Sequence, residues 1–219
     1  MIPAPFDYVR ADDAQAALAA LAQHGDEAKV LAGGQSLLPL MKLRLAVPAV
    51  VVDVSRAAGL SYVRDDGDVV AIGALTRHHD VAGDAVVRRD LPLLARAAGL
   101  VGDPQVRHRG TIGGSVAHAD PSADLPTALL ALGASYVVAG PAGARQVAAE
   151  EFATGFLETV LEPDELLTEV RVPKPAAGAG WGYEKFTRRA IDWATVAVAA
   201  VRRADGTVAV ALANMGPTT

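Results

Sequence analysis

Two glycine-containing segments carry the residue types that a phosphate-binding loop needs. The first, AGGQS at residues 32–36, lies between a predicted strand and a predicted helix. Glycines at such a point allow a sharp turn and present successive backbone N–H groups. Together with the start of a helix, these groups attract an anion such as phosphate. For an isolated Gly-Gly pair, an ordinary strand-to-helix turn is the commoner explanation.

The second segment, RGTIGGS at residues 109–115, contains three glycines and two hydroxyl side chains. It could also hold phosphate through backbone amides, and a tight hairpin is the alternative interpretation. It does not match G-x-G-x-x-G, and the motif G-x-x-x-x-G-K-[ST] is absent from the chain. Two such loops from different subdomains favour a pyrophosphate held between them.

Two acidic residues and two residues near the C-terminus are further candidates. Asp120 and Asp124 could accept hydrogen bonds from sugar hydroxyls, but from the residues alone a helix cap formed by Asp124 or Ser122 is preferred. Lys185 follows a glycine-rich stretch. Trp193, one of two tryptophans, could either pack in the core or stack on a planar ring.

The chain shows no catalytic or metal-binding constellation. Its five histidines do not have the H-E-x-x-H spacing, and no G-x-S-x-G motif occurs. The absence of cysteine excludes disulfides, thiolate metal sites and iron–sulfur ligation by this chain. We therefore expect no catalytic side chain and no metal site here.

The helices and strands that must position these candidate residues are predicted to form two α/β units, followed by a C-terminal segment. Residues 1–56 are predicted to form the first unit, with helices at 14–24 and 36–46 and strands at 29–31 and 50–54. Asp12 or Asp13 is expected to cap the first helix, and Ser36 the second.

Residues 57–176 are predicted to form the second unit, a mixed sheet with helices. Its expected elements are a hairpin at 60–64 and 69–72, helices at 91–100 and 125–132, and strands at 135–139 and 166–172. Residues 174–182 are expected to be a linker. A final hairpin at 195–201 and 207–212 either packs on the preceding unit or begins a third, 177–219.

Composition narrows the class of protein. The chain has 219 residues, of which 51% are hydrophobic, enough for one large domain or two small ones. A net charge of −5 argues against nucleic acid as the main partner. No apolar run reaches the roughly 18–20 residues of a membrane span, and the N-terminus does not read as a signal peptide. The expected location is the cytoplasm.

The order and separation of three motifs carry a family resemblance. They are AGGQSL at residues 32–37, GDPQVRHRGTIGGS at residues 102–115, and YEKF at residues 183–186. The chain strongly resembles the FAD-binding medium subunit of molybdenum hydroxylases, the carbon monoxide dehydrogenase and xanthine dehydrogenase family. The resemblance covers essentially the whole chain.

The resemblance implies an α/β (α+β) protein with the two-subdomain, PCMH-type FAD-binding fold shared with vanillyl-alcohol oxidases, with FAD in the cleft between subdomains. It also implies a C-terminal domain, of which residues 177–219 would be an incomplete beginning, because relatives normally continue further.

The same resemblance assigns residues to the cofactor. It places the first loop at the adenine–diphosphate end and the second at the diphosphate and ribityl chain. It makes Asp124 an FAD contact, against the capping interpretation. The implied cofactor-binding residues are Lys29, Ala32, Gly33, Gly34, Gln35, Ser36, Leu37, Val101, Gly102, Thr111, Gly113, Gly114, Ser115, Asp124, Leu167, Lys185 and Trp193.

The function implied is electron transfer within an oxidoreductase. A large partner subunit would carry molybdenum–molybdopterin, and a small one [2Fe–2S] clusters that pass electrons to FAD on this chain and then to an external acceptor. The implied assembly is a dimer of heterotrimers, and the substrate is left open. Two alternatives remain: a self-sufficient FAD oxidase, for which the chain lacks room for a substrate-cap domain, and a non-catalytic nucleotide-phosphate-binding module.

Overall fold

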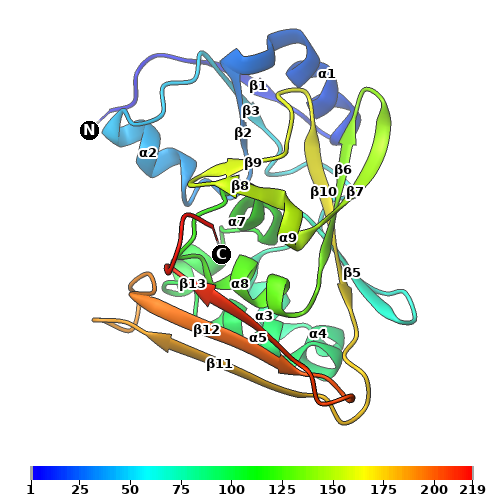
Figure 1. Cartoon of the computed structure of the whole chain (residues 1–219). Helices are drawn as coiled ribbons and strands as arrows, with labels where there is room; N and C mark the ends of the chain where they lie inside the picture. Colours follow the sequence, from blue (N-terminus) through cyan, green and yellow to red (C-terminus); the bar gives the residue numbers. More distant parts are fainter. Residues whose placement is uncertain (1, 219) are drawn as a thin grey trace.

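The computed structural model describes residues 2–218. Its N-terminal part is a three-stranded parallel sheet in the order β1-β3-β2, drawn in blue to cyan in Figure 1. The elements of this part are β1 (Asp7–Arg10), α1 (Ala14–His24), the 3-10 turn η1 (Gly25–Glu27), β2 (Ala28–Leu31), α2 (Leu37–Leu43) and β3 (Val50–Asp53). The predicted helices and strands of this unit are confirmed, and β1 is an additional strand that the sequence analysis missed.

The central strand β3 explains why this small sheet is stable. Val50, Val51 and Val52 are buried, since a parallel sheet is covered on both faces. Asp13, rather than Asp12, caps α1, with Oδ1 accepting from the N–H of Ala16 at 2.8 Å. Because β2 and β3 are parallel, the loop after β2 leaves at the carboxyl edge of the sheet, where open α/β sheets bind ligands.

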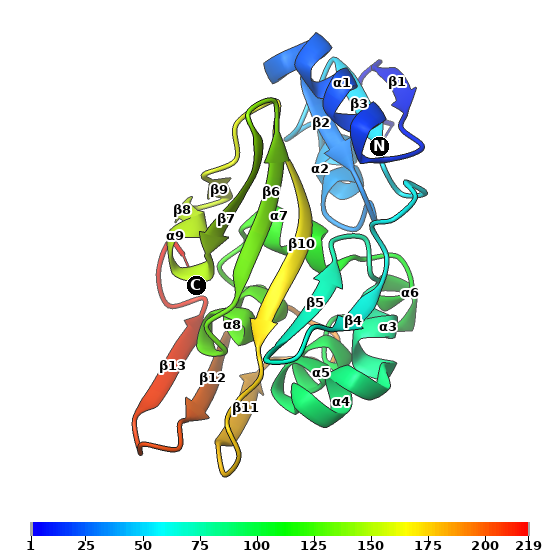
Figure 2. The same ribbon diagram turned by 90° about the vertical axis from the view of Figure 1, so that its right-hand side faces the viewer.

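The middle of the chain forms a five-stranded antiparallel sheet in the order β4-β5-β10-β6-β7, which faces the viewer in Figure 2. Its strands are β4 (Val63–Asp65), β5 (Val69–Gly73), β6 (Ser135–Gly140), β7 (Gly143–Ala148) and β10 (Leu166–Pro173). The predicted hairpin and the strands corresponding to β6 and β10 are confirmed, whereas β7 was not predicted.

Helices pack on one face of this sheet. Side chains such as Ile72 and Val170 from the sheet meet Leu94, Leu125 and Leu129 from the helices in one fully buried core. The remaining elements of this part are α3 (His78–Gly83), α4 (Ala85–Asp90), α5 (Pro92–Gly99), α6 (Pro104–Arg107), α7 (Ile112–His118), α8 (Asp124–Ala131), α9 (Ala149–Phe152), β8 (Ala153–Gly155) and β9 (Glu158–Thr159).

A third, antiparallel sheet follows in the order β11-β12-β13. It comprises β11 (Gly180–Phe186), β12 (Val196–Arg202) and β13 (Val208–Ala213). The predicted final hairpin is confirmed as β12 and β13. The linker prediction is wrong at its end, because residues 180–182 pair with β12 as part of a third strand.

The third sheet packs on the helices of the middle part (Figure 1). Tyr183, Ala199 and Ala211 point inward and share one apolar core with α5 and α8. A separate core fills the N-terminal part, joined by Leu60, Leu75 and Leu166. Within residues 2–218, no helix has both the length and the hydropathy to cross a bilayer.

Candidate functional site

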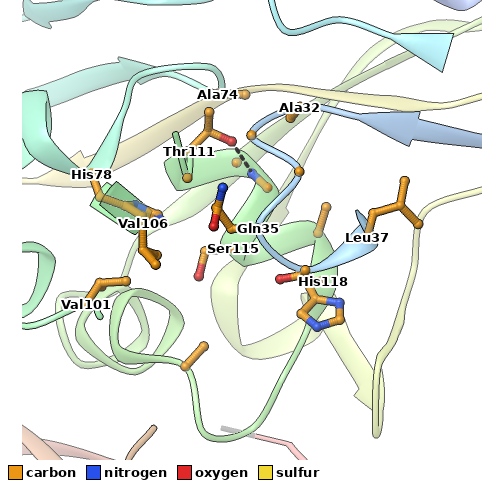
Figure 3. Close-up of a pocket in the computed structure, with 18 of the residues that line it drawn as sticks. Ala32, Gln35, Leu37, Ala74, His78, Val101, Val106, Thr111, Ser115 and His118 are labelled. Carbon is orange, nitrogen blue, oxygen red and sulfur yellow. Dashed lines mark hydrogen bonds between the residues drawn. The ribbon is translucent and has the colours of Figure 1, made fainter. Parts of the chain in front are cut away.

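A cavity of about 410 Å³ lies where these parts meet, and it is viewed in Figure 3. Every residue that the resemblance assigned to the cofactor lines this one cavity, from Lys29 in β2 to Trp193 after β11. Its volume falls in the range of small-molecule binding sites.

The first loop supplies free backbone donors. Within residues 2–218, none of the amides of Gly33, Gly34, Gln35 or Ser36 donates a hydrogen bond to another residue. Gly34 has a φ of 75°, a left-handed conformation that favours glycine. Ser36 occupies the position before α2, but its hydroxyl makes no cap hydrogen bond, so the predicted capping role is wrong. These backbone amides have no hydrogen-bond partner in the described part of the chain, so they can bind an anionic ligand.

The second loop differs from the first in how its backbone amides are used. It is not a hairpin: Thr111 caps α7, with its Oγ1 accepting from the N–H of Gly114 at 3.1 Å (Figure 3). The amides of Ile112, Gly113 and Ser115 donate to Thr76, Ala74 and Thr111.

Most amides of the second loop are therefore already satisfied within the protein. Among residues 111–115, the donors without a partner in the described part of the chain are the N–H of Thr111 and the hydroxyls of Thr111 and Ser115, so the second loop offers fewer free amides than the first.

The two loops touch. A Cβ on Gly33 would overlap the carbonyl oxygen of Arg109 and lie 2.8 Å from the Cα of Gly110. A Cβ on Gly114 would lie 3.8 Å from the Cβ of Ala32. Glycine at position 33 therefore lets the first loop approach the backbone of the second, which brings residues 32–36 and 111–115 to one side of the cavity.

Glycine at position 113 has a packing role. A Cβ there would lie 2.5 Å from the Cβ of Ala74, at the end of β5. The residue thus lets α7 pack closely against the sheet, and it sets where Ser115 enters the cavity. Gly113 is therefore required for close packing of the helix on the sheet.

A buried ion pair also lines the cavity. The Nζ of Lys185 lies 2.8 Å from Oδ2 of Asp124, and the hydroxyl of Tyr183 donates to Oδ1 at 2.6 Å. Burial raises the pKa of Asp124, while the hydrogen bonds from Lys185 and Tyr183 oppose that shift. Burial and the adjacent Asp124 raise the pKa of Tyr183.

Asp124 is the first residue of α8, and Ala123 stands at its cap position without a side-chain hydrogen bond. The capping interpretation of Asp124 and Ser122 is therefore wrong. Because both carboxylate oxygens accept from Lys185 and Tyr183, Asp124 holds β11 against α8 at the wall of the cavity.

Three of the residues that line the cavity differ in exposure. Trp193 is 56% exposed and Ile191 58% exposed, so their apolar surfaces are open to a ligand. The side chain of Lys185, by contrast, is only 6% exposed.

Sequence reasoning missed His78, which lines the cavity near Val106 (Figure 3) and lies against Gly110. The pair His78-His79 shows no metal-ligand spacing, and nothing in the pattern distinguishes the buried first histidine from its exposed neighbour. Its place depends on the bridge between Arg77 and Thr111, which joins α3 to the second loop.

The donor set fits a dinucleotide with an aromatic ring. Free amides and hydroxyls gather at the two loops, whereas much of the rest of the wall is apolar. Val101, Val106, Leu161, Leu166 and Leu167 contribute to these apolar surfaces. The fold and the cavity together define a dinucleotide-binding protein with an α/β core.

Comparison with known proteins specifies the class. The family model for the FAD binding domain in molybdopterin dehydrogenase matches residues 4–175. The carbon monoxide dehydrogenase medium chain of Hydrogenophaga pseudoflava is 46% identical over 100% of this chain and 77% of its own length. The 6-hydroxypseudooxynicotine dehydrogenase complex subunit alpha of Paenarthrobacter nicotinovorans is 42% identical over 92% of this chain and 68% of its own length.

A solved structure supports the same family assignment. A chain of the H. pseudoflava carbon monoxide dehydrogenase that lacks the Mo-pyranopterin moiety of its cofactor superposes with a TM-score of 0.97 at 47% identity. The match covers 100% of this chain and 77% of that one. This chain belongs to the FAD-binding medium subunits of the molybdenum hydroxylases. It is an oxidoreductase subunit whose cofactor is FAD.

Proposed function

We propose that this chain is the electron-transfer subunit of a molybdenum hydroxylase. When bound, FAD supplies the redox chemistry that links the [2Fe–2S] clusters of a small partner subunit to an external electron acceptor. A large partner subunit carries molybdenum–molybdopterin, and the assembly is a dimer of heterotrimers. The observation that carries the proposal is the cavity in which the two glycine loops and the Asp124–Lys185 pair meet.

The chain's own residues bind and orient the cofactor. The amides of Gly33 to Ser36 and the hydroxyls of Thr111 and Ser115 hold the diphosphate and ribityl chain. Lys185 places a fixed positive charge near the flavin ring, and Trp193 covers an exposed ring face. Leu167 lies at the adenine end, and Val101 and Gly102 lie beside the cofactor.

The proposal includes a division of the chain. Residues 1–56 and 57–176 are two subdomains that each contribute one glycine loop, and residues 177–219 form a third unit that contributes Lys185 and Trp193. No side chain of this subunit is assigned a catalytic role, and no metal site is assigned to it.

Spectroscopy of the assembled complex tests the electron path. The complex is purified, and carbon monoxide, a purine and an N-heterocycle are added in turn as reducing substrates. We expect one of them to bleach the flavin absorbance of the complex, and none to bleach the FAD-loaded chain by itself.

Two results would contradict the proposal. Bleaching of the isolated chain by a substrate would indicate a self-sufficient oxidase. Reduction of the iron–sulfur clusters without any flavin bleaching, in a complex with full FAD occupancy, would place this chain outside the electron path.

A further inference from the structure

His78 is the first residue of α3, and its imidazole ring lies against the second glycine loop. Its backbone N–H donates to the carbonyl oxygen of Gly110 at 3.0 Å. A Cβ on Gly110 would lie 2.6 Å from Cδ2 and 2.7 Å from Nε2 of the ring. Gly110 therefore leaves the space that the ring occupies, and the ring forms part of the cavity wall (Figure 3).

The two ring nitrogens have different surroundings. Nδ1 is enclosed by the protein and has no hydrogen-bond partner in the part of the chain that the structure describes. Nε2 also makes no hydrogen bond to any of residues 2–218, but it is not sealed off, and the ring borders the cavity. A buried polar atom without a partner is rare in native proteins and calls for an explanation.

The charge state and the tautomer follow from these surroundings. Burial is the main cause that lowers the pKa of His78 to about 4, and the nearby positive charges of Arg77 and Arg107 act in the same direction. At neutral pH the ring is therefore uncharged and carries one N–H. Nδ1 has no partner in either tautomer, and an unpaired buried N–H donor is rarer in proteins than an unpaired acceptor. The proton is therefore expected on Nε2, which opens to the cavity.

We propose that His78 donates a hydrogen bond from Nε2–H to an acceptor atom of bound FAD and is therefore a cofactor-binding residue. The partner atom is a carbonyl oxygen, ring nitrogen or phosphate oxygen, since an uncharged imidazole N–H can donate to each. This inference rests on FAD occupying the cavity as the proposed function requires.

Side-chain replacement tests the proposal. His78→Gln carries an amide nitrogen near the position of Nε2, whereas His78→Asn carries one near Nδ1, and His78→Leu keeps the bulk without a donor. FAD affinity of the intact chain is measured by titration after removal of bound flavin. We expect about tenfold weaker binding for the Leu and Asn variants, and binding within about threefold of the parent for Gln.

The pattern among variants distinguishes this inference from simple disruption. Melting temperatures of the flavin-free variants are measured in parallel, and we expect the Leu variant to be at least as stable as the parent because it removes the unpartnered Nδ1. Equal FAD affinity for the parent and the Leu variant would overturn the hydrogen bond. If the parent chain itself binds no FAD, the assignment of the cavity fails rather than His78 alone.

A second measurement does not depend on any variant folding. Nitrogen-15 NMR of the histidine-labelled parent reports the tautomer directly. We expect the histidine that stays neutral to the lowest pH to carry its proton on Nε2, and its Nε2 resonance to shift when FAD is added. A proton on Nδ1, or an unchanged Nε2 resonance in the FAD-bound chain, would overturn the proposal.

Discussion

The carboxylate of Asp124 accepts a hydrogen bond from the ammonium group of Lys185 at 2.8 Å, and the two side chains are only 5% and 6% exposed. Lys185 also donates to the carbonyl oxygen of Leu100 at 3.3 Å. The pair joins β11 of the third sheet to α8 of the middle part, so it links the cavity wall to the packing of the third sheet.

Removing one member of this pair should destabilise the chain strongly. Asp124→Ala leaves a buried ammonium group without its counter-ion, and we expect a loss of about 3 kcal/mol in the free energy of unfolding. Denaturation by urea of the flavin-free chain measures this loss. The double variant Asp124→Leu with Lys185→Met should recover part of it, because the hydroxyl of Tyr183 still lacks its acceptor. Both variants should bind FAD more weakly than the parent, since Asp124 and Lys185 line the cavity.

The exposed pair of Arg10 and Asp12 provides the control, because its members are 56% and 75% exposed. Asp12→Ala should change neither the stability nor the FAD affinity measurably. A loss for Asp124→Ala no larger than that for Asp12→Ala would contradict the structural role of the buried pair.

The contact between the glycine loops predicts a large effect at position 33. In Gly33→Ala the new methyl group meets the backbone of Arg109 and Gly110, which cannot move aside as a flexible side chain could. The loops must separate, and we expect FAD affinity to fall by about a hundredfold, equivalent to about 2.7 kcal/mol. Titration of the flavin-free chain with FAD measures the change.

Gly99→Ala is the matched substitution, since its Cβ would meet no atom within 4 Å and the residue lies in α5. It should leave FAD affinity unchanged and raise stability slightly. Normal FAD binding by Gly33→Ala would refute the loop contact as a requirement of the site.

Trp193 should contribute to cofactor binding and little to folding. Its side chain is 56% exposed, so Trp193→Ala should alter the free energy of unfolding of the flavin-free chain by less than about 0.5 kcal/mol. Loss of an aromatic contact should weaken FAD binding about tenfold. Trp181 is also half-exposed but lies outside the FAD cavity, and Trp181→Ala should bind FAD normally.

The neutral state of His78 predicts a dependence of stability on pH. Between pH 6.5 and about 4 the histidine of the unfolded chain takes up a proton while the buried ring does not. Stability therefore falls as the pH falls through this window, by about 3 kcal/mol for a shift of this size. In His78→Leu, urea midpoints should fall less steeply over the same range, and an identical slope would contradict the prediction.

The cap of α1 offers a test confined to the first unit. Asp13→Ala removes the acceptor for the N–H of Ala16 and should cost about 1 kcal/mol of stability. FAD affinity should not change, since Asp13 does not line the cavity. Asp12→Ala is the adjacent control, and an equal loss for both variants would contradict the assignment of the cap.

Local patterns in the sequence determined most of the elements and the membership of the site. The apolar strand at residues 50–53 and the hairpin around Gly206 follow from hydrophobic periodicity and turn residues, which act within a few residues of one another. The motifs at residues 32–37 and 102–115 identified the family, and the residues they implicate line one cavity.

Tertiary packing decided the roles that depend on distant partners. Whether Asp124 caps a helix or binds Lys185 depends on β11, some sixty residues away in the sequence. The hydrophobic periodicity of α8 does not indicate that β11 packs against it. Most amides of the second loop donate to Ala74, Thr76 or Thr111, so their availability to a ligand could not be judged from glycine spacing. His78 differs from His79 only in what packs around it, because burial and hydrogen-bond partners are properties of the folded chain and not of the residue type.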